Sequence, residues 1–148
     1  MNGDTLKWGF LSTARINQAL IEPLRLSERN SLAAVASRSQ EKAEVEASRL
    51  NDRFSSERAT SAVVDAADVA TLRQAMSGVD MVVVASSTSQ YVEQVATAAL
   101  DAGIDYCDVQ YSTAKLAVLQ GMAERIEAEG RCFITEGGFH PGLPAALV

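Results

Sequence analysis

Short apolar runs alternate with segments of helical composition along the chain, and this alternation constrains the fold more than any other feature. The runs are rich in Val, Ile and aromatic residues, which favour strands. We predict strands at Leu6–Leu11, Ser31–Ala36, Ala62–Val64, Met81–Ala85, Asp105–Val109 and Arg131–Thr135. We predict helices near Ala14–Leu26, Gln40–Arg53, Val69–Met76, Gln90–Ala102 and Ala114–Glu129, where Ala, Glu, Gln, Arg and Leu are frequent. Right-handed crossovers then give an α/β fold, a doubly wound parallel sheet of Rossmann type with helices on both faces.

Glycine and proline mark the ends of these elements. Gly78, Gly103 and Gly130 each follow a predicted helix and precede a predicted strand, where a left-handed residue commonly ends a helix. Pro23 conflicts with the first helix, because proline removes a backbone hydrogen bond. We therefore expect that helix to kink or to end near Glu22.

Composition limits the classes of partner. The 148 residues are 47% hydrophobic, which is enough for a single domain over residues 1–148 to bury its own core. The formal net charge is −6 and the Lys and Arg residues are scattered, which argues against nucleic acid and anionic membranes as partners. The chain has no apolar stretch of membrane-spanning length, and Met1–Asp4 does not resemble a secretory signal. We expect a cytoplasmic protein.

The chain holds Cys107, Cys132 and a single histidine, His140, without the spacing of a metal site, so we expect no bound metal. Each cysteine falls in a predicted strand. A disulfide requires the two strands to be neighbours, whereas two reduced, buried thiols fit a cytoplasmic protein better.

The segment Leu6–Ile16 has the form of a dinucleotide phosphate site, in which an apolar strand breaks into small residues and then begins a helix. The backbone N–H groups of such a turn and the positive end of the helix dipole favour a pyrophosphate. Ser12, Ala14 and Asn17 occupy the three glycine positions of the usual G-x-G-x-x-G pattern, and their side chains are expected to crowd the turn. The alternative is an ordinary buried strand that meets an ordinary helix. The residues assigned to the phosphate site are Ser12, Thr13, Ala14, Arg15 and Ile16.

The end of the second predicted strand favours NADP over NAD. An NAD site normally places a carboxylate about 20 residues beyond the glycines, where it binds the adenosine ribose. This chain has Ser37, Arg38 and Ser39 there, and their hydroxyls and guanidinium suit the 2′-phosphate of NADP. The alternative is that Ser39 caps the next helix while Arg38 is a solvated surface residue. NAD is kept as a second cofactor.

Two further strand ends complete the predicted cofactor site. Asp65 closes the third strand, where an adenine amino group would lie, whereas Asp68 fits the N-cap of the following helix. The fourth strand is apolar throughout and opens into small hydroxylated residues at the expected reversal of strand order, where ligands bind. We therefore add Ala85, Ser86 and Ser87 to the candidate cofactor residues. The alternative is a capping cluster, in which Ser87 and Gln90 form a weak capping box.

These residues resemble two known families. Trp8–Asn17, Ala34–Ser39 and Lys42–Ala43 look like the opening of the Gfo/Idh/MocA sugar oxidoreductases. The Glu-Lys-Pro that those proteins carry after the fifth strand is replaced here by Asp108–Ser112.

From Gly78 onward the chain resembles the cofactor domain of saccharopine dehydrogenase-like oxidoreductases, through Asp80–Val84, Ala98–Asp108 and Gly137–Pro144. That family follows its last nucleotide-domain strand with a Pro-Gly turn beside the nicotinamide. Pro141-Gly142 matches this turn, although His140 stands where an acidic residue is common.

Both resemblances imply a Rossmann-type fold and a nicotinamide cofactor, and they disagree on the substrate. We expect the NADP-binding domain of a saccharopine dehydrogenase-like oxidoreductase, which holds the cofactor for hydride transfer. The alternatives are a sugar oxidoreductase cofactor domain and a non-catalytic NADPH-binding or redox-sensing module.

In the family resembled, the Pro-Gly turn leads into the catalytic domain, and here the chain ends six residues after Gly142. We expect that a small-molecule substrate is bound through a second domain missing from this chain, and that the fragment alone is inactive. No catalytic residue is assigned. His140 is either a proton donor near the nicotinamide or a turn residue, and the sequence leaves a homo-oligomer open.

Overall fold

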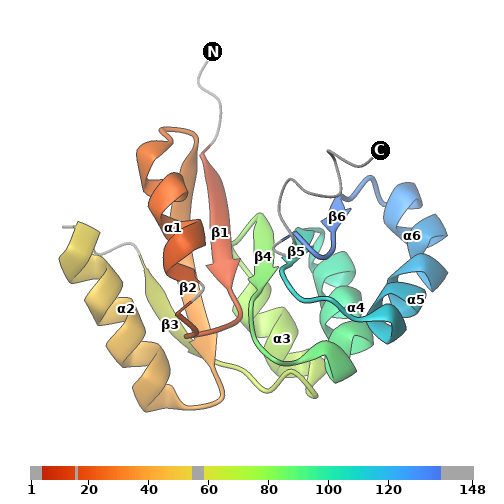
Figure 1. Ribbon diagram of the computed structural model, residues 1–148, viewed down its shortest axis with the longest axis horizontal. Helices are drawn as coiled ribbons and strands as arrows, with labels where there is room; N and C mark the ends of the chain where they lie inside the picture. Colours follow the sequence, from red (N-terminus) through yellow and green to blue (C-terminus); the bar gives the residue numbers. More distant parts are fainter. Residues whose placement is uncertain (1–4, 16, 55–58, 138–148) are drawn as a thin grey trace.

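The computed structural model describes residues 5–15, 17–54 and 59–137 (Figure 1). In this part of the chain, six strands form one parallel sheet with the order β3-β2-β1-β4-β5-β6. The strands are β1 (Leu6–Phe10), β2 (Asn30–Ser37), β3 (Thr60–Val63), β4 (Met81–Val84), β5 (Asp105–Asp108) and β6 (Phe133–Ile134). The order reverses between β1 and β4, as in a doubly wound Rossmann fold. The predicted fold class is confirmed.

Helices cover both faces of the sheet. They are α1 (Asn17–Leu26), α2 (Gln40–Phe54), α3 (Val69–Met76), α4 (Val92–Ala102), α5 (Thr113–Gly121) and α6 (Ala123–Ala128), with a 3-10 turn η1 (Ser89–Tyr91) before α4. In Figure 1, α1 and α2 lie in front of the sheet and α3 and α4 behind it. All five predicted helices are therefore present, although the last divides into α5 and α6 at Met122.

The two faces carry separate hydrophobic cores because side chains alternate along each strand. Phe10, Val35 and Val83 pack with the apolar residues of α1 and α2. Val82 and Tyr106 point to the other face and pack with residues of α3, α4 and α5. Strand β4 is buried along its whole length, as its continuous apolar run predicts for a central strand.

Helix α1 runs through Pro23 to Leu26, so it does not end near Glu22, and the alternative of a kink at the proline stays a prediction. Ile21 and Leu24 flank the proline and are only 2% and 8% exposed in the core beneath α1. Burying each of these side chains is worth about 1.5–3 kcal/mol. Together they outweigh the roughly 3 kcal/mol that an interior proline costs, and the helix continues.

The predicted helix caps are confirmed. Gly78, Gly103 and Gly130 have φ angles of 86°, 67° and 62°, in the left-handed region that favours glycine. The Asp68 carboxylate accepts a 2.8 Å hydrogen bond from the Ala70 N–H and caps α3. These caps fix where the chain leaves the sheet and where it returns.

Cys107 and Cys132 are both free thiols, but the expectation that both are buried is wrong. Cys107 lies in β5 and is half-buried. Cys132 is exposed and directly precedes β6, which is the edge strand of the sheet within the described residues. Within the described residues, no helix is long and apolar enough to span a bilayer, and no group of His, Cys, Asp and Glu side chains could hold a metal ion.

Candidate functional site

The carboxyl ends of the parallel strands meet at one edge of the sheet, and the sequence-predicted site residues follow those ends. Ser12, Thr13, Ala14 and Arg15 follow β1, and Ser37, Arg38 and Ser39 close β2 or follow it; Asp65 follows β3, and Ala85, Ser86 and Ser87 follow β4. Ile16, His140 and the Pro141-Gly142 turn lie outside the described residues. The fold thus gathers residues from four separate segments at a single edge.

The turn after β1 is held by its own side chains. The Ser12 hydroxyl accepts a 2.8 Å hydrogen bond from the Ala14 N–H, and the Asn17 amide donates one of 2.8 Å to the Ser12 carbonyl oxygen. None of the described residues of this turn has a positive φ. Ser12 and Ala14 therefore replace glycine without backbone strain, and the N–H groups of Thr13 and Arg15 make no hydrogen bond to the described part of the chain.

Asn17, at the third glycine position, was expected to crowd the contact between helix and strand. Its side chain is instead fully enclosed and hydrogen-bonded. The Oδ1 atom of Asn17 is also buried, and it has no hydrogen-bond partner. A buried polar atom left unpaired is uncommon in proteins and often marks a site that a ligand or water completes.

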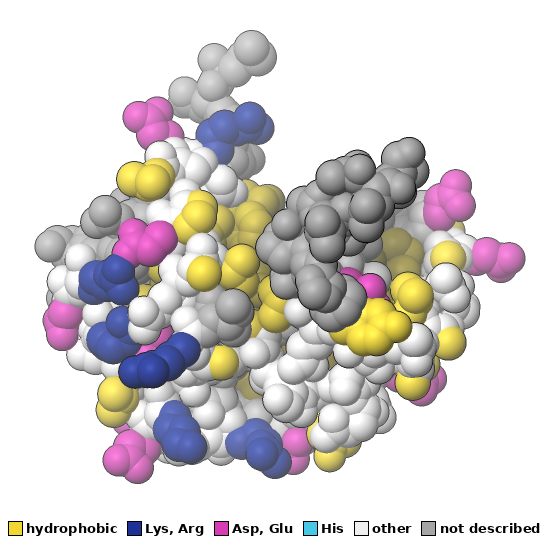
Figure 2. Space-filling view, in the orientation of Figure 1, with side chains coloured by type: hydrophobic (Ala, Val, Ile, Leu, Met, Phe, Trp, Pro, Cys, Tyr) yellow, Lys and Arg dark blue, Asp and Glu magenta, His cyan; other side chains and the backbone are white. Residues whose placement is uncertain are grey.

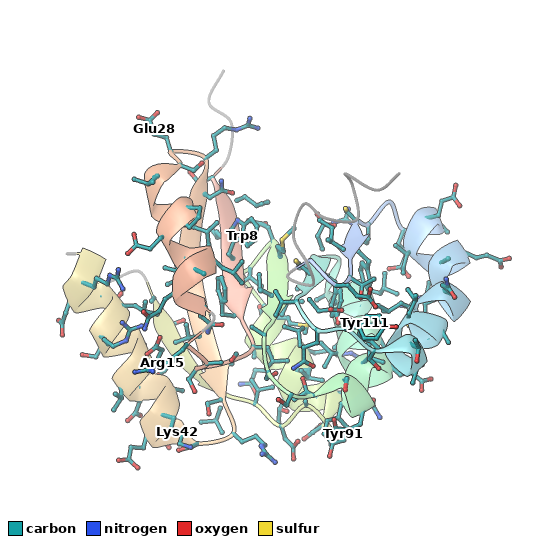
Figure 3. All side chains as sticks on the ribbon, viewed as in Figure 1. Trp8, Arg15, Glu28, Lys42, Tyr91 and Tyr111 are labelled. Carbon is teal, nitrogen blue, oxygen red and sulfur yellow. The ribbon has the colours of Figure 1, made fainter. Side chains whose placement is uncertain are left out.

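Arg15, Arg38 and Lys42 bring positive charge to the ends of β1 and β2. All three are exposed, and none forms an ion pair with the described residues. Figure 3 labels Arg15 beside the start of α1 and Lys42 in the first turn of α2. On the face drawn in Figure 2, most Lys and Arg side chains lie over α1 and α2 and along the lower rim. This half of the sheet edge is suited to an anion.

The serines at the end of β2 also have local structural roles. The Ser37 hydroxyl accepts a hydrogen bond from the Ser39 N–H at 3.2 Å, and the Ser39 hydroxyl accepts one from the Lys42 N–H at 3.4 Å. Ser39 thus caps the start of α2. A hydroxyl that accepts from the backbone still has its own hydrogen to donate, so this role is compatible with a ligand contact.

The residues after β3 and β4 form turns of their own. Asp65 is exposed, and its carboxylate accepts a 3.0 Å hydrogen bond from the Ala67 N–H. The Ser86 and Thr88 hydroxyls are 2.9 Å apart, and Ser87 is exposed. The alternative of a capping box between Ser87 and Gln90 is wrong, because Thr88 occupies the cap position of η1 and no side chain bonds there.

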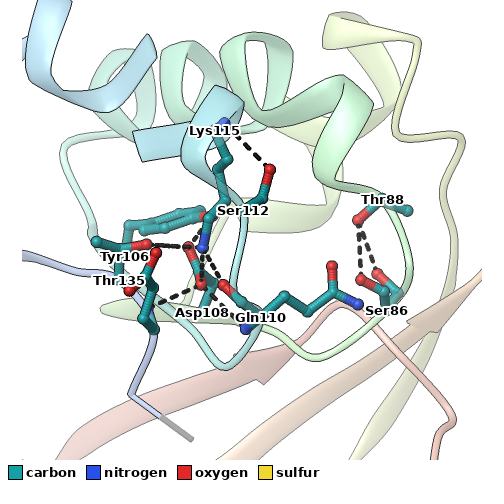
Figure 4. Close-up of polar contacts among 9 residues, drawn as sticks. Ser86, Thr88, Tyr106, Asp108, Gln110, Ser112, Lys115 and Thr135 are labelled. Carbon is teal, nitrogen blue, oxygen red and sulfur yellow. Dashed lines mark hydrogen bonds and ion pairs between the residues drawn. The ribbon is translucent and has the colours of Figure 1, made fainter. Parts of the chain in front are cut away.

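A buried ion pair at the ends of β5 and β6 was missed by the sequence analysis (Figure 4). Asp108 and Lys115 pair with side chains that are each 2% exposed. The Asp108 carboxylate also accepts hydrogen bonds from Tyr106 (2.9 Å), Thr135 (2.9 Å) and the Gln110 and Glu136 N–H groups (3.2 and 3.1 Å). Lysine is rarely buried, so a lysine near the start of a helix is expected to be solvated. Of the two residues, only Asp108 has a position, at the end of a strand, that indicates a functional site.

All three ammonium hydrogens of Lys115 are used. They are donated to Asp108, to the Gln110 carbonyl oxygen and, at 2.7 Å, to the Thr135 hydroxyl. Burial, reinforced by Asp108, raises the pKa of Tyr106 well above that of an ordinary tyrosine, so its hydroxyl stays protonated and donates to Asp108. Burial likewise raises the pKa of the Cys107 thiol. The cluster joins β5, α5 and β6 into one unit.

Comparison with known proteins assigns the family. The model of the saccharopine dehydrogenase NADP binding domain matches residues 20–131. The chain belongs to this family. It is therefore an NADP-binding domain, and the sugar-oxidoreductase alternative is not favoured. The match begins in α1, after the turn that follows β1, and it ends at Arg131, before β6.

Solved structures share the fold. The apo saccharopine dehydrogenase (L-Glu forming) of Saccharomyces cerevisiae superposes with a TM-score of 0.73 at 19% identity, over 94% of this chain and 28% of that chain. An Agrobacterium radiobacter oxidoreductase in complex with NAD+, L-tartaric acid and magnesium has a TM-score of 0.65 at 16% identity, over 90% and 36% of the two chains. Biliverdin reductase from Synechocystis, in complex with biliverdin and NADP+, has a TM-score of 0.62 at 18% identity, over 88% and 37%. No curated protein sequence matches significantly.

Proposed function

We propose that this NADP-binding domain holds the cofactor for hydride transfer in an oxidoreductase, and that a further domain binds a small-molecule substrate. The present chain spans 28% of the yeast saccharopine dehydrogenase to which it is similar, which supports a division of labour between domains. When bound, the cofactor supplies the hydride, and the protein supplies position and electrostatics. The isolated chain is then expected to bind the cofactor without turnover.

The three unpaired cations at the ends of β1 and β2 carry this proposal. The chain as a whole has a net charge of −6, yet Arg15, Arg38 and Lys42 stand at the sheet edge without a carboxylate partner among the described residues. Unpaired cations at this edge are suited to bind the negatively charged 2′-phosphate, which is the group that distinguishes NADP from NAD. We assign Arg38, with Ser37 and Ser39, to this phosphate.

The turn after β1 suits the pyrophosphate. The Thr13 and Arg15 N–H groups have no partner in the described chain, and the first turn of α1 follows directly. Free backbone donors at a helix start bind a phosphate oxygen without a side-chain charge. The Ser12 hydroxyl accepts from the Ala14 N–H and so holds the shape of the turn. We assign Ser12–Ile16 to the pyrophosphate.

The remaining predicted residues frame the two ends of the cofactor. Asp65 lies at the end of β3 and accepts from the adenine amino group in this proposal. Ala85, Ser86 and Ser87 lie beyond the central strand β4, at the reversal of strand order, and contact the ribose and phosphates.

A titration of NADPH against NADH tests the proposal. We expect NADPH to bind at least about tenfold more tightly, because one charge-assisted contact to the 2′-phosphate is worth about 1.5–3 kcal/mol. Equal affinity for the two cofactors would contradict the assignment of Arg38. Absence of binding for both would contradict the proposed function as a whole.

A further inference from the structure

Glu136 adopts a backbone conformation that glutamate avoids. Its φ angle is 61°, and it is the one non-glycine residue in the described chain with a positive φ. The left-handed region is sterically unfavourable for a side chain with a Cβ atom, and residues held there cluster at functional sites. Glu136 directly follows the short strand β6 and Thr135, at the carboxyl edge of the sheet.

Asp108 holds this conformation from two sides. Its carboxylate accepts a hydrogen bond from the Glu136 N–H at 3.1 Å, and its backbone oxygen accepts one from the Gly137 N–H at 2.8 Å. A Cβ atom at Gly137 would lie 3.4 Å from the same backbone oxygen, so the chain passes close to β5 here. Lys115 and Thr135 fix the Asp108 carboxylate in turn. The left-handed turn is therefore built into the Asp108–Lys115 cluster.

The Glu136 side chain lacks a partner for one of its oxygens. The Oε1 atom is buried and accepts no hydrogen bond. A carboxylate oxygen removed from water without a donor is costly, and this cost adds to the strain of the backbone. Glu136 thus combines an unfavourable backbone conformation with an unpaired carboxylate oxygen, and the buried Asp108–Lys115 pair holds it in place. This combination indicates a side chain whose missing hydrogen bond a ligand supplies.

Lys115 is not the residue that binds the ligand. Its three hydrogens already bond to Asp108, Gln110 and Thr135, so no donor remains for a ligand while this network is intact. Lys115 acts through Asp108 as a positioning residue, whereas Glu136 has a buried acceptor oxygen that no group in this network uses.

We propose that Glu136 is a hydrogen-bond acceptor for the nicotinamide riboside half of the cofactor. A dinucleotide whose adenosine half lies over β1–β3 places its second half over the ends of β4, β5 and β6. That half offers the carboxamide N–H groups and the ribose hydroxyls, which are donors that suit a carboxylate. This inference rests on the proposed function, and it adds a contact that neither the sequence analysis nor the family match assigns.

The test compares NADPH with adenosine 2′,5′-bisphosphate, which is the adenosine half of NADP alone. Binding of both ligands is measured by calorimetry for the unmodified chain, for Glu136→Ala and for Glu136→Gln. Glu127→Ala is the control, because Glu127 is an exposed glutamate in α6, and its side chain has no ion pair among the described residues. Thermal unfolding verifies that each variant is folded.

We expect Glu136→Ala to weaken NADPH binding by about tenfold or more and to change bisphosphate binding by less than about twofold. Glu136→Gln keeps an acceptor oxygen and should recover part of the loss, whereas Glu127→Ala should change neither ligand. If Glu136→Ala does not fold, Glu136→Gly replaces it, because glycine adopts the left-handed region without strain and has no side-chain acceptor. That variant should show the same selective loss.

Three results would overturn the inference. The first is an unchanged affinity for NADPH in the Glu136 variants, and the second is an equal loss of affinity for both ligands in a folded variant. The third is an unmodified chain that binds NADPH no more tightly than it binds the bisphosphate. The last result leaves the proposed function standing, because the adenosine half still binds. An unmodified chain that binds neither ligand contradicts the proposed function itself.

Discussion

The side-chain amide of Asn17 donates a 2.8 Å hydrogen bond to the backbone carbonyl oxygen of Ser12, across the turn that joins β1 to α1. In the usual dinucleotide turn a glycine stands at this position and lets helix and strand approach closely. Here a fully buried amide ties the start of the helix to the end of the strand. The chain thus replaces a close contact with a hydrogen bond.

The first prediction follows from this bond. Asn17→Ala should lower the free energy of unfolding by about 1–3 kcal/mol, because the Ser12 carbonyl oxygen is left buried without its donor. Chemical denaturation measures the change. Gln18→Ala is the control, because Gln18 is exposed in the same turn of α1 and its replacement should have little effect. Equal stability of the two variants would mean that water replaces the amide.

Arg38 and Arg29 stand at opposite ends of β2, and this allows a matched test of cofactor preference. Arg38→Ala should weaken NADPH binding by about 1.5–3 kcal/mol and leave NADH nearly unchanged, because only NADPH carries the 2′-phosphate. Arg29→Ala removes the same charge from the far edge of the sheet and should alter neither cofactor. Similar losses for both cofactors in Arg38→Ala would contradict a contact with the 2′-phosphate.

Ala14 lies in the turn where the backbone must approach the pyrophosphate. Ala14→Val should abolish cofactor binding and leave the fold intact, because the added methyl groups occupy the space above the turn. Circular dichroism checks the fold, and a titration with NADPH measures binding. Retained affinity in the folded variant would place the nucleotide elsewhere.

Lys115 and Lys42 are each the third residue of their helix, but only Lys115 is buried. Lys115→Met should lower the free energy of unfolding by about 3–5 kcal/mol, because it leaves the Asp108 carboxylate buried without its counter-charge. Lys42→Met should change stability by less than about 0.5 kcal/mol. Comparable effects in the two variants would show that the Asp108–Lys115 pair contributes no more than a surface charge.

The reactivity of the Cys107 thiol in β5 tests whether its pKa is raised in the folded chain. Burial, reinforced by Asp108, raises the pKa of Cys107, so less reactive thiolate is present at a given pH than for an ordinary thiol. In a Cys132→Ser variant we expect Cys107 to react with a disulfide reagent more slowly in the folded chain than in denaturant at pH 8. Its rate should keep rising at pH values where an ordinary thiol is fully ionised. A plateau at the ordinary thiol pKa would contradict the shift.

Much of the fold follows from local sequence. Apolar runs of strand length, the left-handed glycines after α3, α4 and α6, and the Asp68 cap depend on residues a few positions apart, so the strands and helices were predictable. Parallel strands place their carboxyl ends together, so Ser12, Arg38 and Ser86 could be assigned to one edge before the structure was known. Their contacts with a cofactor stay predictions.

The tertiary structure decided what depends on residues far apart in the chain. Helix α1 passes Pro23 because Ile21 and Leu24 meet a sheet built from distant segments. The left-handed conformation of Glu136 depends on Asp108, a residue 28 positions earlier, and Lys115 is buried only because Asp108, Gln110 and Thr135 surround it. A local pattern records neither the burial of a charge nor the strain of a turn, because both are set by the neighbours that folding brings together.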